Sequence, residues 1–297
     1  MDITKITGFI AASGVLLGAS VAFGGIVLQP NTLLVADRTN NSLRLLDAVS
    51  GSQISSVAMP TNTNRTLEGV AIVGNEAYVC FKGTSQSQYN EIDRVNLETG
   101  SLSLNLYGFS PVGLASRSPH LVLANWGGLT TPSVVRHTTS GGFFSSQSYL
   151  PNTTFGLGEA VDDIAWSGSR YVTVSNYRLP GAGSFNLISW NGDQPSYLIY
   201  EAPTLSFSYP AANMWAEGLD VNTQDGSYWV SFNPTQGSSG HSVIDRIDAV
   251  TGARTRLQLS GMGAISDLVY VTIPAPAAAA IFAASLLHGV RRQRKSA

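Results

Sequence analysis

The sequence predicts an all-β protein, a β-propeller of about five four-stranded blades flanked by one helix at each end. Three observations carry this prediction. Only 12% of the 297 residues are charged and 30 are glycine, a balance typical of turn-rich β proteins. One strand-like segment recurs along the chain. Each copy leads into a second strand that ends in a glycine turn, the pattern of consecutive β-hairpins.

The recurring segment has two or three apolar residues, an alternating stretch and a polar turn. Its spacing is close to the roughly 40–50 residues of propeller repeats. A further strand follows each pair, and four copies are also preceded by one. The segments begin at Thr32, Glu76, His120, Arg170 and Ser227, and the preceding strands begin at Glu68, Val112, Asp162 and Glu217.

The first copy lacks a preceding strand, while an unmatched strand, "SDLVYVTI", begins at Ser266. A propeller closes when one terminus completes the blade begun by the other, which hides the sheet edges. We therefore expect the C-terminal strand to be the innermost strand of the first blade. A β-sandwich with similar hairpins and a six-bladed ring remain open, the latter because segments 150–161 and 203–214 are ambiguous.

The first copy, "LLVADRTNNSLRLLDAVSG", resembles the NHL and YVTN group of propeller repeats. The match is clear in this copy and blurred in the others. The resemblance implies a propeller that serves as a binding platform, although relatives include metal-dependent lactonases, and a fold alone does not define a reaction. The matching residues are Leu34, Val35, Ala36, Asp37, Asn40, Asn41 and Asp47.

Residues 1–25 read as a secretory signal peptide. Lys5 precedes an apolar run, and Ser20 and Ala22 place small side chains at the −3 and −1 positions of a cleavage site for signal peptidase. An uncleaved membrane anchor remains an alternative, because apolar character continues to Leu28. Residues 31–273 then form the predicted propeller domain.

Residues 274–297 combine a short proline motif, an apolar run and a basic end. The run from Ala277 to Val290 is shorter than the roughly 20 residues of a typical spanning helix. This tail resembles the PEP-CTERM sorting signals of bacteria, in a Pro-x-Pro form. The resemblance implies recognition by an exosortase and removal of the tail on the way to the cell surface. The motif comprises Pro274, Ala275 and Pro276 with Arg291, Arg292 and Arg294.

Ala275 stands where the usual motif has Glu, which leaves the sorting enzyme open, and a plain C-terminal anchor is the alternative reading. Either way the body is exported and lies at the surface or outside the cell, with its basic end kept inside. The tail holds a cluster of basic residues, so the body is more acidic than the net charge of −2 indicates. An acidic body argues against nucleic-acid binding. Cys80 is the only cysteine, which excludes an intrachain disulfide.

Propeller geometry predicts where a binding site lies. The first strand of a blade begins, and the second ends, on the same face around the axis. Carboxylates and amides at these positions suit Ca²⁺, and aromatic rings beside them suit a sugar or another ligand. The ligand-binding candidates are Glu68, Asp162, Glu217, Arg38, Lys82, Trp126 and Tyr177. The candidate metal ligands are Glu68, Asn125, Asn176, Glu217 and Asn233.

A plainer interpretation is local pairing, in which Glu68 binds Lys82 or Arg38. The histidines lack the spacing of a zinc site or a triad, and no phosphate loop or nucleophile elbow occurs. "DVNTQDG" from Asp220 reads as a hairpin turn, and Cys80 as a buried thiol. The sequence therefore predicts a non-enzymatic, exported protein that binds a ligand or a matrix component such as an exopolysaccharide. A metal-dependent lactonase with Asp162 as its base is the alternative.

Overall fold

The computed structural model describes residues 25–272 in several stretches. Both predicted terminal segments lie outside the described residues, so the signal peptide and the sorting tail stay predictions. Within the described part of the chain every regular element is a strand, and no helix there is long and apolar enough to cross a membrane. The internal gaps are 61–63, 84–89, 109–110, 119, 126–132, 141–142, 150–160, 177–183, 192–196, 201–204, 211–212, 236–240 and 260.

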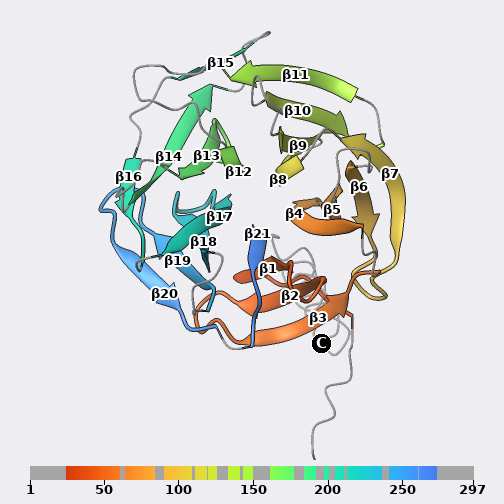
Figure 1. The fold of residues 1–297 in the computed structure, drawn as a ribbon, viewed down its shortest axis with the longest axis horizontal. Coiled ribbons are helices and arrows are strands. Elements are labelled where there is room, and N and C mark those ends of the chain that lie inside the picture. Colours follow the sequence, from red (N-terminus) through yellow and green to blue (C-terminus); the bar gives the residue numbers. More distant parts are fainter. Residues whose placement is uncertain are drawn as a thin grey trace, which may run out of the picture.

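The strands form four hydrogen-bonded sheets in a propeller-like ring (Figure 1). Three of the sheets are four-stranded and antiparallel. The first contains β21 (Ile265–Val271), β1 (Thr32–Asp37), β2 (Ser42–Asp47) and β3 (Gln53–Ala58). The second contains β4 (Arg65–Val73), β5 (Glu76–Gly83), β6 (Asn90–Val95) and β7 (Leu102–Gly108). The third contains β17 (Met214–Val221), β18 (Tyr228–Pro234), β19 (Val243–Ile247) and β20 (Arg254–Leu257).

The fourth sheet has nine strands and consists of two antiparallel units. One contains β8 (Pro111–Arg117), β9 (His120–Asn125), β10 (Ser133–Thr138) and β11 (Phe143–Tyr149). The other contains β12 (Val161–Trp166), β13 (Tyr171–Asn176) and β14 (Ser184–Asn191), with β15 (Tyr197–Tyr200) and β16 (Leu205–Ser208) both paired to β14. The two units join where β11 and β15 pair in parallel, at Ser148 with Tyr197 and Tyr149 with Leu198.

The C-terminal strand closes the ring, as the sequence predicts. β21 pairs antiparallel with β1, from Thr32 opposite Val271 to Asp37 opposite Ile265. The inner strands β4, β8, β12, β17 and β21 each contact the next around the axis, and β21 contacts β4 (Figure 1). This closed circle is propeller-like and is not a sandwich of two stacked sheets.

Apolar side chains fill the space between neighbouring sheets. Leu34 and Leu45 of the first sheet pack with Leu67 and Val79 of the second, and all four are fully buried. Between β14 and β18 the rings of Phe185 and Phe232 meet edge to face, with their centroids 5.1 Å apart. Each sheet packs one of its faces against the preceding sheet and the other face against the next sheet. The hydrophobic core is therefore distributed around the ring.

Every inner strand carries a β-bulge near its start, where two of its residues face one on the second strand. The second bulge residue is Gly69, Gly113, Asp163, Gly218 or Asp267. A Cβ on Gly113 would lie 1.7 Å from Oδ1 of Asp163, and one on Gly218 would lie 2.8 Å from Cα of Asp267. Gly113 and Gly218 therefore make room for the two aspartates at the axis, while a Cβ on Gly69 would meet Cys80 and Leu114.

Candidate functional site

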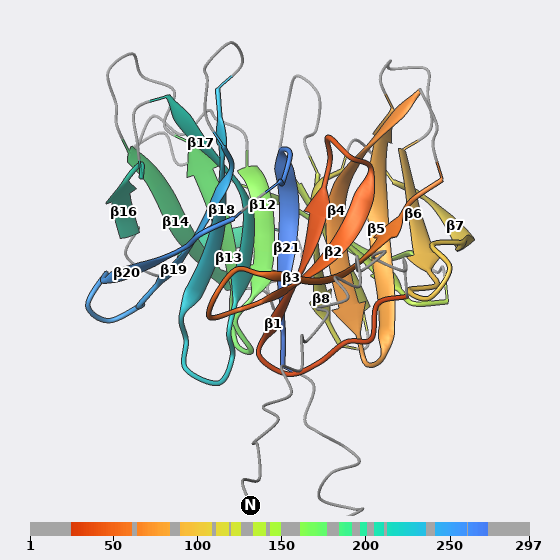
Figure 2. The ribbon, with the colours of Figure 1, turned by 90° about the horizontal axis from the view of Figure 1, so that it is seen from below.

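The upper mouth is the end of the axis where the inner strands begin, at the top of Figure 2. Arg38, just after β1, lies there between two bulge residues. Its Nη1 donates to Oε2 of Glu68 at 3.2 Å, and its Nη2 donates to Oε2 of Glu217. The side chains are 29%, 13% and 23% exposed in that order, so this cluster is in contact with solvent. The predicted bridge from Glu68 to Arg38 is confirmed.

Arg38 offsets part of the negative charge of the cluster. Burial raises the pKa of Glu217, while the Arg38 guanidinium counteracts that rise and the Glu68 carboxylate adds to it. Thr66 Oγ1 donates a further hydrogen bond of 2.8 Å to Oε1 of Glu68. One cation held by two carboxylates leaves the cluster with an excess of negative charge that faces the solvent.

The amides of Asn176 and Asn233 tie neighbouring parts of the ring together. Oδ1 of Asn176 accepts from the Ala216 N–H at 3.0 Å, and its Nδ2 donates to the Ala216 carbonyl at 2.6 Å. Asn233 repeats the same two contacts with Ile265, at 2.8 and 2.7 Å. Each asparagine lies at or next to the end of a second strand and binds the start of the next inner strand, so both amides have a structural partner.

The structure does not bring the other predicted site residues together in one cluster. Asp162 accepts a hydrogen bond of 2.6 Å from Nδ2 of Asn176, in its own unit of the sheet. It does not join the Arg38 cluster. The carbonyl of Lys82 accepts from Thr66 Oγ1. Asn125 ends β9, but its side chain lies outside the described residues, as do all of Trp126 and Tyr177.

Among the described side chains, no group of three or more His, Cys, Asp or Glu could hold a metal ion. The two carboxylates that a metal at the upper mouth would need both bind Arg38. Ca²⁺ prefers six to eight oxygen ligands, and the two described amides are already bound to backbone. The metal site stays a prediction, and these contacts favour the ion-pair interpretation.

Below the upper mouth, two aspartates meet on the axis. Asp163 of β12 and Asp267 of β21 are fully buried and hydrogen-bonded to each other. We call them the axial pair. Each inner strand donates to the pair the N–H that follows its bulge. The five donors are Val70 (2.8 Å), Leu114 (3.4 Å), Ile164 (2.7 Å), Leu219 (2.6 Å) and Leu268 (2.6 Å).

The axial pair holds a proton. Burial raises the pKa of Asp163 well above its ordinary value, and raises the pKa of Asp267 to about 8. One carboxyl of the pair must carry a proton to donate their mutual hydrogen bond, so the raised pKa belongs to the pair as a whole. Two adjacent carboxylates cannot both ionise cheaply, so sharing one proton stabilises the buried arrangement.

Both aspartates lie near the start of an inner strand, where the sequence predicts a solvent-exposed mouth, but the structure buries them below it. A signal was nevertheless present. When the inner strands are aligned at their bulges, three have glycine at the position where β12 and β21 have aspartate. Only the ring geometry shows that these two positions face each other.

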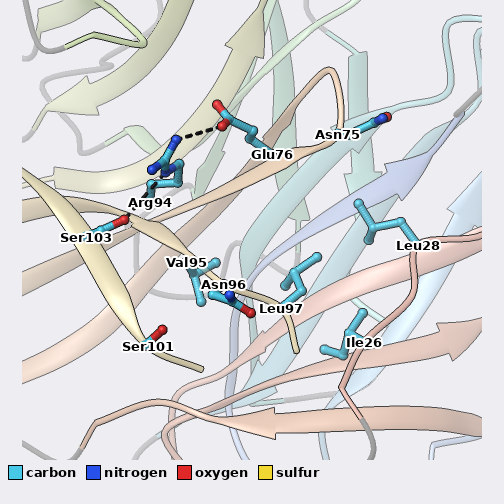
Figure 3. Close-up of a pocket in the computed structure, with 10 residues that line it drawn as sticks. All are labelled: Ile26, Leu28, Asn75, Glu76, Arg94, Val95, Asn96, Leu97, Ser101 and Ser103. Carbon is cyan, nitrogen blue, oxygen red and sulfur yellow. Dashed lines mark hydrogen bonds and ion pairs between the residues drawn. The ribbon is translucent and has the colours of Figure 1, made fainter. Parts of the chain in front are cut away.

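A separate groove of about 590 Å³ lies beside the N-terminal segment (Figure 3). Ile26 and Leu28 form one wall. On the other side, Arg94 donates a hydrogen bond of 2.7 Å to Oε1 of Glu76. Ile26 is 5% exposed and its N–H donates to the Leu97 carbonyl. The apolar residues that continue past the predicted signal peptide are therefore part of the folded domain.

No protein-family model and no curated protein matches the sequence. Among solved structures, the nidogen/laminin complex matches with 10% identity and a TM-score of 0.49, over 81% of this chain and 98% of that chain. Hydrazine synthase of Kuenenia stuttgartiensis matches with 14% identity and a TM-score of 0.43, over 87% and 72%.

A putative 6-phosphogluconolactonase of Bacteroides fragilis matches with 12% identity and a TM-score of 0.42, over 82% of this chain and 84% of that chain. With TM-scores below 0.5, these similarities assign no activity to this chain.

Proposed function

We propose that this protein is an exported, non-enzymatic β-propeller of five blades that binds a surface or matrix component at its upper mouth. The blade count rests on the inner strands, which form a closed circle of five. The nine-stranded sheet counts as two blades, because among the described residues its halves are paired as strands only at the two residue pairs of β11 and β15.

The Arg38–Glu68–Glu217 cluster carries the binding proposal. It presents both signs of charge to solvent at the entrance of an axis that the axial pair fills below. Its groups are bound to each other, which suits recognition better than proton transfer, since a general base needs a free carboxylate or imidazole aimed at the substrate. A neutral, hydroxyl-rich polymer matches this surface, because Arg38 can donate hydrogen bonds to its oxygens and the two carboxylates can accept hydrogen bonds from its hydroxyl groups.

Export and attachment at the surface are part of the same proposal, and the two ends of the ring's first sheet fix its orientation. β1 begins and β21 ends at the same end of the ring, opposite the upper mouth (Figure 2). If the C-terminal segment attaches the protein to a membrane before an exosortase removes it, the upper mouth faces away from that membrane. The PEP-CTERM-like signal, the signal peptide and a location at the cell surface are all parts of this proposal.

The binding proposal is tested by titrating the purified protein with the neutral, hydroxyl-rich polysaccharide dextran. We expect Arg38→Gln to weaken binding at least tenfold, while the matched control Arg94→Gln, which breaks an exposed ion pair with Glu76 on the outside of the ring, leaves binding unchanged. Equal effects of the two substitutions, or no binding by the wild type, would contradict a recognition role for the upper mouth. Intact mass from the native host tests the processing: loss of residues beyond about Pro276 is expected.

The alternative, a metal-dependent lactonase, uses the same residues differently. It requires Glu68 and Glu217 to exchange Arg38 for a metal ion within about 2.3–2.6 Å. Lactone hydrolysis that depends on added Ca²⁺ and is abolished by Glu217→Gln would replace the binding proposal with this one.

A further inference from the structure

The end of the axis opposite the upper mouth opens into a cavity of about 630 Å³, which we call the lower funnel. Its size suits a small organic molecule. Leu114, Ile164, Leu219 and Leu268 line it, and the N–H groups of these same residues hold the axial pair. The lower funnel is therefore blind, with the axial pair behind its inner end.

The lower funnel contains one carboxyl group without a counter-ion. Asp220 of β17 lines the cavity, and its Oδ2 accepts from the Tyr270 N–H at 2.7 Å. A second backbone N–H, that of Val221, also donates to it. In the described part of the chain no lysine or arginine pairs with Asp220. The side chain lies deep but keeps some accessible surface, because the cavity reaches it.

Aromatic rings stand on the walls around this carboxyl. Trp166 and Tyr270 both line the cavity. Tyr270 is fixed by stacking on Trp229, with centroids 5.4 Å apart, and by donating its hydroxyl hydrogen to Oδ1 of Asn31. The guanidinium of Arg117 lies 4.1 Å from the Trp166 ring centroid, so this indole already interacts with one cation.

We propose that the lower funnel binds an organic amine, with its ammonium group on Asp220 and its carbon frame against Trp166 and Tyr270. A buried carboxylate without a counter-charge is costly, and a ligand ammonium removes that cost. An acidic ligand would be repelled, and a neutral alcohol would leave the charge uncompensated. Nothing in this proposal depends on the upper mouth.

The electrostatic surroundings predict how binding varies with pH. Asp220 adds to the rise in the pKa of Asp267 on β21, and the ion pair of Asp225 with Arg246 acts on the hydroxyl of Tyr270, which also lines the cavity. Burial raises the pKa of Asp220 to about 7. Alkylammonium groups with a pKa near that of lysine, about 10, stay charged well above this value. Binding should therefore strengthen as the pH rises from 6 to 8, when the carboxyl ionises.

The experiment uses benzylammonium as the probe, with benzyl alcohol and benzoate as neutral and acidic matches, in calorimetric titrations of the whole protein. At pH 8 we expect benzylammonium alone to bind, at least threefold more tightly than at pH 6. Asp220→Asn should weaken it at least tenfold. Asp225→Asn, on the same hairpin but exposed and paired with Arg246, is the matched control and should bind as the wild type does. Glu217→Gln should also bind normally, which separates this site from the upper mouth.

Three results would overturn the proposal: no binding of benzylammonium at pH 8, equal binding by Asp220→Asn, or tighter binding of benzoate or benzyl alcohol. If Asp220→Asn does not fold, Trp166→Leu provides the second test. This substitution should weaken benzylammonium binding and leave its pH dependence unchanged. If the variant binds benzylammonium as tightly as the wild type does, the proposed site is wrong.

Discussion

The upper mouth and the axial pair each bring together two carboxyl groups from different inner strands, and they neutralise them differently. At the mouth, Glu68 and Glu217 share the guanidinium of Arg38 and remain partly exposed. At the axis, Asp163 and Asp267 share a proton and accept five backbone N–H groups, fully buried. Solvent can replace Arg38 at the mouth, but nothing can replace the lost acceptors at the axis. The first arrangement therefore suits recognition, and the second suits ring closure.

The largest expected effect is a difference in the free energy of unfolding between a substitution at the axial pair and one at the upper mouth. Asp267→Ala leaves the N–H groups of Val70, Leu114 and Leu268 without their acceptor. At about 1–3 kcal/mol for each buried unsatisfied group, we expect the free energy of unfolding to fall by more than about 3 kcal/mol. Glu217→Gln should cost less than about 1 kcal/mol, because its ion pair is partly exposed. Urea denaturation measures both, and equal losses would remove the distinction.

The pH dependence of stability sharpens the same comparison. The folded-state pKa values of Asp267, about 8, and Asp220, about 7, exceed the unfolded value of about 3.9. Between about pH 4 and 8 the folded state then binds more protons than the unfolded state, so the free energy of unfolding falls as the pH rises. Urea midpoints measured across this range should decline in the wild type and decline less in Asp267→Asn. A midpoint that rises steadily to pH 8 would contradict a protonated axial pair.

A smaller effect is expected from the asparagine ties. Asn233→Ala leaves the N–H of Ile265, at the start of the closing strand, without its acceptor, and leaves the Ile265 carbonyl with only the longer contact to Ser231 Oγ among the described groups. We expect a loss of roughly 2 kcal/mol, and a similar loss from Asn176→Ala, which has the same geometry. Asn75→Ala, in an exposed turn, is the control and should stay within about 0.5 kcal/mol. If the three variants unfold at the same urea concentration, these amides do not hold the ring.

The smallest expected effect is that of Ca²⁺ on stability. Glu68 and Glu217 already bind Arg38. We therefore expect the same thermal unfolding midpoint in millimolar Ca²⁺ as in the presence of a chelator. An ion that bound only the folded state, at about a hundred times its dissociation constant, would add roughly 2.7 kcal/mol. A rise in midpoint that disappears in Glu217→Gln would show that the upper mouth is a metal site after all.

Much of the fold was predictable because it is periodic. The recurring segments mark the second strand of each unit, and the unmatched strand at Ser266 indicates how the ring closes, since its partner is missing at the other end of the sequence. The bridge between Glu68 and Arg38 was also predictable, because propeller topology places the start of one strand beside the end of another.

The axial pair and the lower funnel were less accessible to sequence reasoning. Asp163 and Asp267 lie about a hundred residues apart, and no local pattern distinguishes a carboxyl that solvent reaches from one that five N–H groups enclose. Asp220 opens the predicted hairpin motif and looked like a turn residue, whereas the turn itself spans Asn222 to Ser227. Its depth depends on β21, which arrives from the far end of the chain.

The central claim, that a proton-sharing carboxyl pair closes the axis, is tested most directly by a ¹³C NMR titration of the aspartate side-chain carboxyls. The account predicts one carboxyl signal that titrates near pH 8 and is missing from the spectrum of Asp267→Asn. If every aspartate carboxyl of the folded wild type titrates below pH 5, the pair is not protonated, and this explanation of ring closure is wrong.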